Sequence, residues 1–310
     1  MAHPDEAKAA PGESLPIAYA TAILGWLLSA GVYIAAKWAA PEMGPWALCF
    51  WRLLLACAIL LPIVHRHYGA IIALLRARPL EVLLVGAIGL TLCQGMIYTG
   101  LHFTNATTAG IIMALSPVMT MVIARIVLGE PLGLWKAIGA LLALAGMLVI
   151  VAHGDLGALK GLQFSAGELW IVGSAFCWGL YTVLLRRARF GIPLLPTVVV
   201  LLGAGALAAL PFYLCELTGG GSALNANGLL ALAYLAGPGG ALMYYLYNRS
   251  VEALGAGRAS MLLYLQTVFV ALLAYLLLGE SLHDYDIWGA AFIVAGLVLP
   301  VVIKQRPEVV

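Results

Sequence analysis

Charged residues are scarce in this sequence. Asp, Glu, Lys and Arg together make up 10% of the 310 residues, against about 25% in an average soluble domain. Hydrophobic residues make up 63%, and the mean hydropathy is +1.01. So few polar side chains cannot cover a water-soluble globule of this length, which excludes a soluble enzyme and a disordered chain. A protein that crosses the membrane several times remains.

Several chemical signatures are also missing. The five cysteines lie inside apolar runs and form no CxxC pair, so we expect small packing residues and no disulfide or metal framework. No GxxxxGK[ST] phosphate loop is present, so the sequence implies no ATPase subunit. The basic tracts are too short for nucleic-acid binding. The histidines are scattered, and we predict neither a metal nor a cofactor.

Long apolar runs are what the sequence has instead. A membrane-spanning helix needs about 20 mostly apolar residues. Ten segments between charges, prolines and glycine clusters satisfy this length: 16–38, 45–64, 79–101, 105–128, 133–152, 166–186, 193–216, 228–250, 255–278 and 285–304. The alternating pattern of transmembrane strands is absent. We therefore predict an all-α membrane protein with ten transmembrane helices.

The Lys and Arg residues predict the orientation, because they accumulate in cytoplasmic loops. With both termini in the cytoplasm, nearly all of them fall on the inner side, whereas Lys37 and Lys160 fall outside. This arrangement makes 1–15 and 305–310 cytoplasmic tails and 153–165 an external linker.

The two halves of the chain repeat each other with an offset of 150 residues. Leu128-Gly129-Glu130-x-Leu132 aligns with Leu278-Gly279-Glu280-x-Leu282. Each half, 16–152 and 166–304, contains five predicted spans, and because five is odd the second half enters the membrane in the opposite orientation. Inverted repeats are typical of secondary transporters, whose substrate site lies near the midplane between the repeats. The alternative is a duplication retained for folding alone.

Polar residues in the third and eighth spans are the best candidates for such a site. Thr91, Gln94 and Tyr98 share one helical face, and Tyr244 and Asn248 occupy the repeat-equivalent positions of Gln94 and Tyr98. Polar side chains inside a membrane are costly, so they face a cavity or form hydrogen bonds between helices. Both roles remain open for this face.

Further candidates are polar or aromatic residues on the first, fourth, sixth and ninth spans: Tyr33, Ser116, Trp178, Tyr181, Tyr264 and Gln266. Together these residues predict a neutral and mostly apolar cavity. A flat aromatic side chain would stack on Tyr or Trp, and an ammonium group could lie over a ring. Aromatic amino acids and apolar organic cations both fit this chemistry, whereas a phosphate would need several buried cations.

Two features inside the spans have an open role. Arg52 is charged and lies well inside the second span, where it binds helix-end carbonyls or contacts substrate. The eighth span contains Gly237-Pro238-Gly239-Gly240, which lacks one backbone donor and most side-chain restraint, and Gly89 is the repeat mate of Gly239. Interruptions at corresponding positions predict a hinge, and a fixed kink for packing is the alternative.

These features resemble the drug/metabolite transporter superfamily, in particular its ten-helix EamA-type branch. The resemblance rests on the half-repeats, on Phe50-Trp51-Arg52-Leu53-Leu54 and on the GE-x-L turn after the fourth helix of each half, and it covers about residues 16–304. Within the superfamily, the chain is most similar to the aromatic amino acid exporters. One departure is Ser281, which stands where the first half has Pro131. The two halves therefore need not move equivalently.

The resemblance implies a carrier in the bacterial inner membrane that works by alternating access without ATP. Its partners would be a small-molecule substrate, most simply an aromatic or other neutral amino acid, and the lipid bilayer. Export of apolar organic cations is the alternative substrate prediction. A channel or an intramembrane enzyme is the alternative class.

Overall fold

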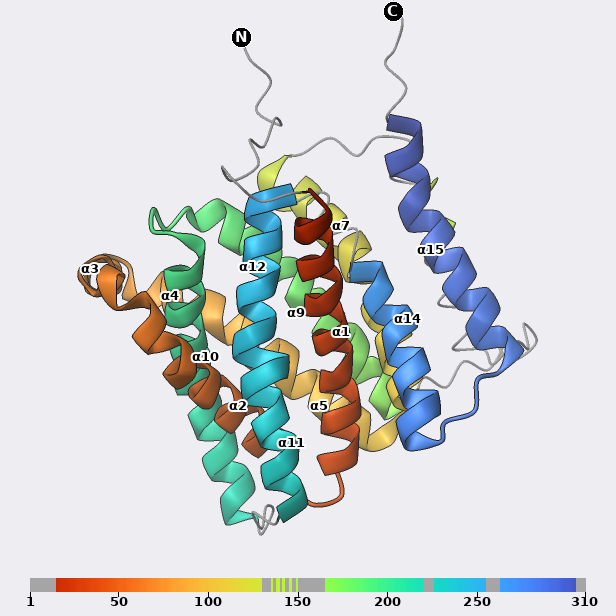
Figure 1. Ribbon diagram of the computed structural model, residues 1–310, viewed down its shortest axis with the longest axis horizontal. Helices are drawn as coiled ribbons and strands as arrows, with labels where there is room; N and C mark the ends of the chain where they lie inside the picture. The colour runs from red at the N-terminus through yellow and green to blue at the C-terminus, as the bar shows by residue number, and fades with distance from the viewer. Residues whose placement is uncertain are drawn as a thin grey trace, which may run out of the picture.

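The computed structural model describes residues 15–129, 165–219, 226–254 and 263–304, together with isolated positions between 135 and 149 (Figure 1). Every regular element in these ranges is a helix. Seven helices are long and apolar enough to cross a membrane, and Leu265–Leu278 is a shorter apolar helix. The predicted fifth span, the linker 153–165 and both tails lie mostly outside the described residues. The described chain is the predicted all-α membrane bundle.

The helices of the first half follow one another with short links: α1 (Leu15–Ala39), α2 (Pro45–Leu60), the 3-10 helix η1 (Leu61–His67), α3 (Tyr68–Ala77), α4 (Pro79–Gly86), the π-helix η2 (Ala87–Leu92), α5 (Cys93–Phe103), α6 (Ala106–Met113) and α7 (Ser116–Leu128). The second half contains α9 (Ala166–Ala188), α10 (Leu194–Thr218), α11 (Ala226–Ala236), the π-helix η4 (Gly237–Leu242), α12 (Met243–Leu254), α14 (Leu263–Leu273), the π-helix η5 (Ala274–Leu278) and α15 (Asp284–Lys304).

Local sequence explains several helix starts. Pro45 and Pro79 stand in the first turns of α2 and α4, where a missing N–H is harmless. Asn105 caps α6 by accepting a hydrogen bond from the Thr108 backbone N–H, and Ser165 forms a capping box with Glu168 at the start of α9.

The repeat is visible in the backbone. The third span (α4, η2, α5) and the eighth (α11, η4, α12) each contain a π-helical turn, and η2 and η4 begin 150 residues apart. Gly129 and Gly279, also 150 residues apart, both end a helix in the left-handed conformation, with φ of 70° and 67°. Two independent irregularities thus recur at one offset, as expected for two copies of one five-helix unit.

Helices of the two halves pack against one another in matching pairs. Helix α1 packs on α12 and α14, and its repeat mate α9 packs on α5 and α7; α2 packs on α10, and α6 on α14. Such pairing relates the halves by an approximate two-fold axis. The start of α1 and the end of α15 lie at the same end of the bundle, as an even number of crossings requires (Figure 1).

Small residues permit the closest of these contacts. A Cβ added to Gly86 on α4 would lie 2.9 Å from the Ala204 Cβ on α10. A Cβ added to Gly146, in the fifth span, would lie 2.5 Å from the Gly289 carbonyl oxygen on α15. These glycines therefore join helices within one chain.

Proline divides the fourth span into α6 and α7. Pro117 has no N–H, and its ring clashes with the carbonyl four residues earlier, at Met113, where α6 ends. The backbone continues through tighter i→i−3 bonds, from Ala114 N to Ile111 O and from Leu115 N to Ile112 O, both 3.0 Å. In the second half Thr267 takes the place of Pro117, and α14 is continuous there. The halves are thus unequal at this level of the bundle.

Candidate functional site: a cavity between the two halves

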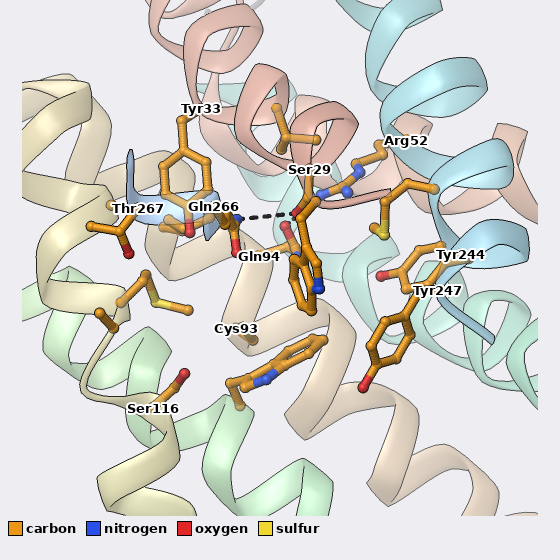
Figure 2. A pocket seen from close by; sticks show the side chains of 18 residues that line it. Ser29, Tyr33, Arg52, Cys93, Gln94, Ser116, Tyr244, Tyr247, Gln266 and Thr267 are labelled. Atoms are coloured by element: carbon orange, nitrogen blue, oxygen red, sulfur yellow. Dashed lines mark hydrogen bonds between the residues drawn. The ribbon is translucent and has the colours of Figure 1, made fainter. Parts of the chain in front are cut away.

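A cavity of about 70 Å³ lies among helices of both halves, and Figure 2 shows the 18 side chains that line it. They come from α1, α2, α5, α6, α7, α9, α12 and α14 and from the break between α6 and α7. Five are aromatic: Trp26, Tyr33, Trp178, Tyr244 and Tyr247. Five are neutral and polar: Ser29, Gln94, Ser116, Gln266 and Thr267. The lining is therefore mostly apolar with a few hydrogen-bonding groups.

Six of the ten predicted site residues line this cavity: Tyr33, Gln94, Ser116, Trp178, Tyr244 and Gln266. The side chains of Asn248 and Tyr264 lie outside the described residues. Tyr98 and Tyr181 are close to the cavity but do not line it.

Tyr98 and Tyr181 have other contacts. Tyr98 is 1% exposed, and its hydroxyl accepts a hydrogen bond of 2.6 Å from Arg52 Nη1. The Tyr181 ring packs so closely on η2 that a Cβ added to Gly89 would lie 2.0 Å from its Cδ2. The ring also lies 5.4 Å from Trp178, tilted by 43°. Tyr98 and Tyr181 thus act on the cavity through the residues they hold.

Arg52 fills both roles that the sequence left open. Its Nε donates to the Leu235 carbonyl at 3.2 Å and its Nη2 to the Gly239 carbonyl at 3.1 Å, so it binds the backbone around η4. Its Nη1 donates to Gln94 Oε1 and to the Tyr98 hydroxyl on α5. The guanidinium also lines the cavity, on the side of Gln94 (Figure 2). One buried cation therefore connects the third span with the eighth.

The fourth-span break places Ser116 in the cavity wall. Ser116 is the first residue of α7, directly after the turn that Pro117 imposes, and it is 1% exposed. Its hydroxyl has no hydrogen-bond partner among the described residues, and it points into the cavity (Figure 2). Buried polar groups are normally paired. The unpaired hydroxyl is therefore a free hydrogen-bonding position for a bound molecule.

Several lining residues escaped the sequence analysis. Ser29 lies one helical turn before Tyr33 and accepts a hydrogen bond of 3.1 Å from Gln266 Nε2, which connects the two halves (Figure 2). Trp26 meets Tyr247 edge to face, with ring centroids 5.4 Å apart. Extending each predicted helical face by one turn would have found Ser29 from Tyr33 and Tyr247 from Tyr244.

The predicted hinge residues have different surroundings. A Cβ added to Gly239 would lie 2.8 Å from Val32 Cγ2, and one added to Gly240 would lie 2.5 Å from the Leu235 carbonyl oxygen. A Cβ at Gly237 would meet nothing within 4 Å. Pro238 stands in the first turn of η4. Gly89 and Gly239 thus both allow a close approach, which explains two of the glycines by packing and leaves the hinge a prediction.

The cavity lacks the means for metal chemistry. No group of three His, Cys, Asp or Glu residues that could hold a metal occurs in the described ranges. Arg52 is the one charged residue among the described lining, and the remaining groups are rings, hydroxyls, amides and apolar side chains. Such a surface can bind and orient a small molecule.

The family to which the chain belongs agrees with this geometry. The EamA-like transporter family matches residues 16–152 and 165–302. The chain is therefore a member of this family of membrane proteins that transport small molecules, and it is a transporter, not an enzyme.

Two relatives extend along most of the chain. The uncharacterized transporter YyaM of Bacillus subtilis (strain 168) is 26% identical over 279 residues, which cover 89% of this chain and 90% of that one. The uncharacterized inner membrane transporter YicL of Salmonella typhimurium is 31% identical over 254 residues, covering 80% and 82%. A crystal structure with 21% sequence identity superposes with a TM-score of 0.66 over 95% of this chain and 100% of the other, which shows a common fold.

Proposed function

We propose that this protein exports aromatic amino acids across the inner membrane through the cavity between its halves. The observation that carries the proposal is the ring of five aromatic side chains around a small set of neutral polar groups. Stacking on such rings contributes about 0.5–1.5 kcal/mol per pair beyond the burial of area. Gln94, Ser116 and Gln266 supply hydrogen bonds that orient the polar end of a substrate.

Alternating access is the mechanism we propose. A cavity of about 70 Å³ is small, because pockets for small ligands usually measure about 300–1,000 Å³. The helices must therefore separate before a phenylalanine fits. The paired π-helices in the third and eighth spans lie where a change of helix direction would widen the cavity.

Transport by proteoliposomes containing the purified protein tests the proposal. Trp178 lines the cavity, whereas Phe176 on the same helix is 47% exposed and does not line it. Burying a large apolar side chain contributes about 1.5–3 kcal/mol, so partial loss in Trp178→Ala should weaken the apparent affinity for phenylalanine about tenfold. Phe176→Ala is the matched control and should behave as wild type. Leucine transport should change less than phenylalanine transport in Trp178→Ala.

Two results would contradict the proposal. One is the absence of phenylalanine, tyrosine and tryptophan transport in active vesicles that carry other neutral amino acids or organic cations. The other is an equal effect of Trp178→Ala and Phe176→Ala on aromatic transport.

A further inference from the structure

Arg52 is a buried charge whose partners are all neutral. It is 2% exposed, and its four hydrogen bonds go to two backbone carbonyls, an amide oxygen and a phenol. No ion pair with Asp or Glu joins it to the described residues. A guanidinium has five N–H donors, so one N–H on Nη2 remains without a partner in the described part of the chain.

An uncompensated charge in a membrane interior is costly. Hydrogen bonds to neutral acceptors offset part of the desolvation, but removal of the counter-charge from a buried ion pair typically destabilises a protein strongly. A position of this kind therefore attracts an anion that can enter from outside. The Arg52 guanidinium lines the cavity, so an entering anion can reach it.

The rest of the lining sets the sign and the size of that anion. The described cavity wall contains no Asp or Glu, so an ammonium group would meet a cation and find no carboxylate. A doubly charged phosphate would exceed the single positive charge. A carboxylate matches one guanidinium in charge and in planar geometry. It could take the free N–H and replace the neutral Gln94 oxygen on Nη1, because charge-assisted hydrogen bonds are about twice as strong as neutral ones.

We propose that the cavity recognises small monocarboxylates through Arg52, and that the amino group of an amino acid is dispensable for binding. The aromatic rings hold the apolar part of the substrate, and the Ser116 hydroxyl offers a further hydrogen bond. The inference deepens the proposed export function and rests on the same cavity. It excludes organic cations as substrates, since they would bring a second positive charge to Arg52.

A set of three ligands with one ring tests this inference without any mutation. Counterflow of labelled phenylalanine in proteoliposomes is measured against unlabelled phenylalanine, 3-phenylpropanoate, which lacks the amino group, and phenethylamine, which lacks the carboxylate. We expect 3-phenylpropanoate to compete within about threefold of phenylalanine and phenethylamine to compete at least tenfold more weakly. Competition by phenethylamine as strong as that by 3-phenylpropanoate would overturn the inference and leave aromatic export intact.

The same ligands separate the inference from the export proposal. If phenylalanine is not transported, thermal stabilisation of the purified protein by each ligand replaces counterflow. Stabilisation by 3-phenylpropanoate and not by phenethylamine then supports the carboxylate site although the export proposal has failed. Equal stabilisation by both ligands, or by neither, refutes the carboxylate site.

Replacement of the arginine gives a second, independent test. Arg52→Gln removes the charge and should reduce the preference for 3-phenylpropanoate over phenethylamine at least tenfold. Arg76→Gln is the matched control, because Arg76 is exposed on α3 outside the cavity, and it should retain the wild-type preference. A folded Arg52→Gln protein with unchanged preference would contradict the inference. If Arg52→Gln does not fold, the wild-type ligand set decides.

Discussion

The glycines of η4 differ in how much space their neighbours leave. A Cβ at Gly239 would press on Val32 Cγ2 at 2.8 Å and on Tyr234 Cε1 at 3.0 Å, whereas Gly237 has open space around it. The two residues are two positions apart in the same π-helix, so an alanine at either one changes helix propensity alike. Only the packing against the first half differs between them.

We therefore expect Gly239→Ala to lower the melting temperature and transport, and Gly237→Ala to leave both close to wild type. Forcing a methyl group into a packed interior typically costs about 1–3 kcal/mol. Thermal denaturation in detergent, with initial transport rates in vesicles, measures both effects. Equal behaviour of the two variants would show that contact with Val32 and Tyr234 is unimportant.

At the scale of elements, carboxylates of the second half cap helices of the first. Glu216, near the end of α10, accepts hydrogen bonds from the Trp46 and Ala47 N–H groups at 2.9 and 3.2 Å, at the start of α2. Glu280 accepts from the Ala106 and Thr107 N–H groups at 2.8 and 3.1 Å, at the start of α6. The first N–H groups of a helix have no intrahelical partner, and the helix dipole favours negative charge there. These contacts tie the halves together at the end of the bundle opposite the start of α1.

Loss of one such contact should destabilise the protein measurably. Glu280→Ala removes both backbone bonds and the bond of 2.8 Å from Thr107 Oγ1, which we expect to cost about 1–2 kcal/mol. Glu280→Gln retains an acceptor without the charge and should lie between Glu280→Ala and wild type. Melting temperatures in detergent give the order, and a Glu280→Ala protein as stable as wild type would contradict the role of the cap.

At the scale of the whole molecule, the orientation in the membrane remains to be tested. The charge pattern predicts both termini in the cytoplasm, with the loop 217–227 outside and the loop 187–192 inside. In a cysteine-free background, Ser222→Cys should react with an impermeant thiol reagent in intact cells and Arg189→Cys only after the membrane is opened. The reverse pattern would invert the topology, and equal reaction would reject the number of crossings between the two loops.

Sequence reasoning was most successful where a feature depends on one helix or on the repeat. The offset of 150 residues paired Gly89 with Gly239, and both lie in π-helical turns. It was less successful where several helices meet. Gln94 and Tyr98 share a helical face, yet Gln94 lines the cavity whereas the Tyr98 hydroxyl is turned to Arg52. Which side chains of different helices come together depends on interhelical packing, and a helical face alone does not specify it.

The paired π-helical turns also date an event in the history of the chain. A π-helical turn accommodates one residue more than an α-helical turn, so it is the structural trace of a single-residue insertion. Two separate insertions after the duplication would have reached the same register in η2 and η4 only by coincidence. The widened turn is therefore older than the duplication, and a five-helix ancestor already had it. Later substitutions changed the residues around it, as Pro238 opposite Ile88 shows, but not its place.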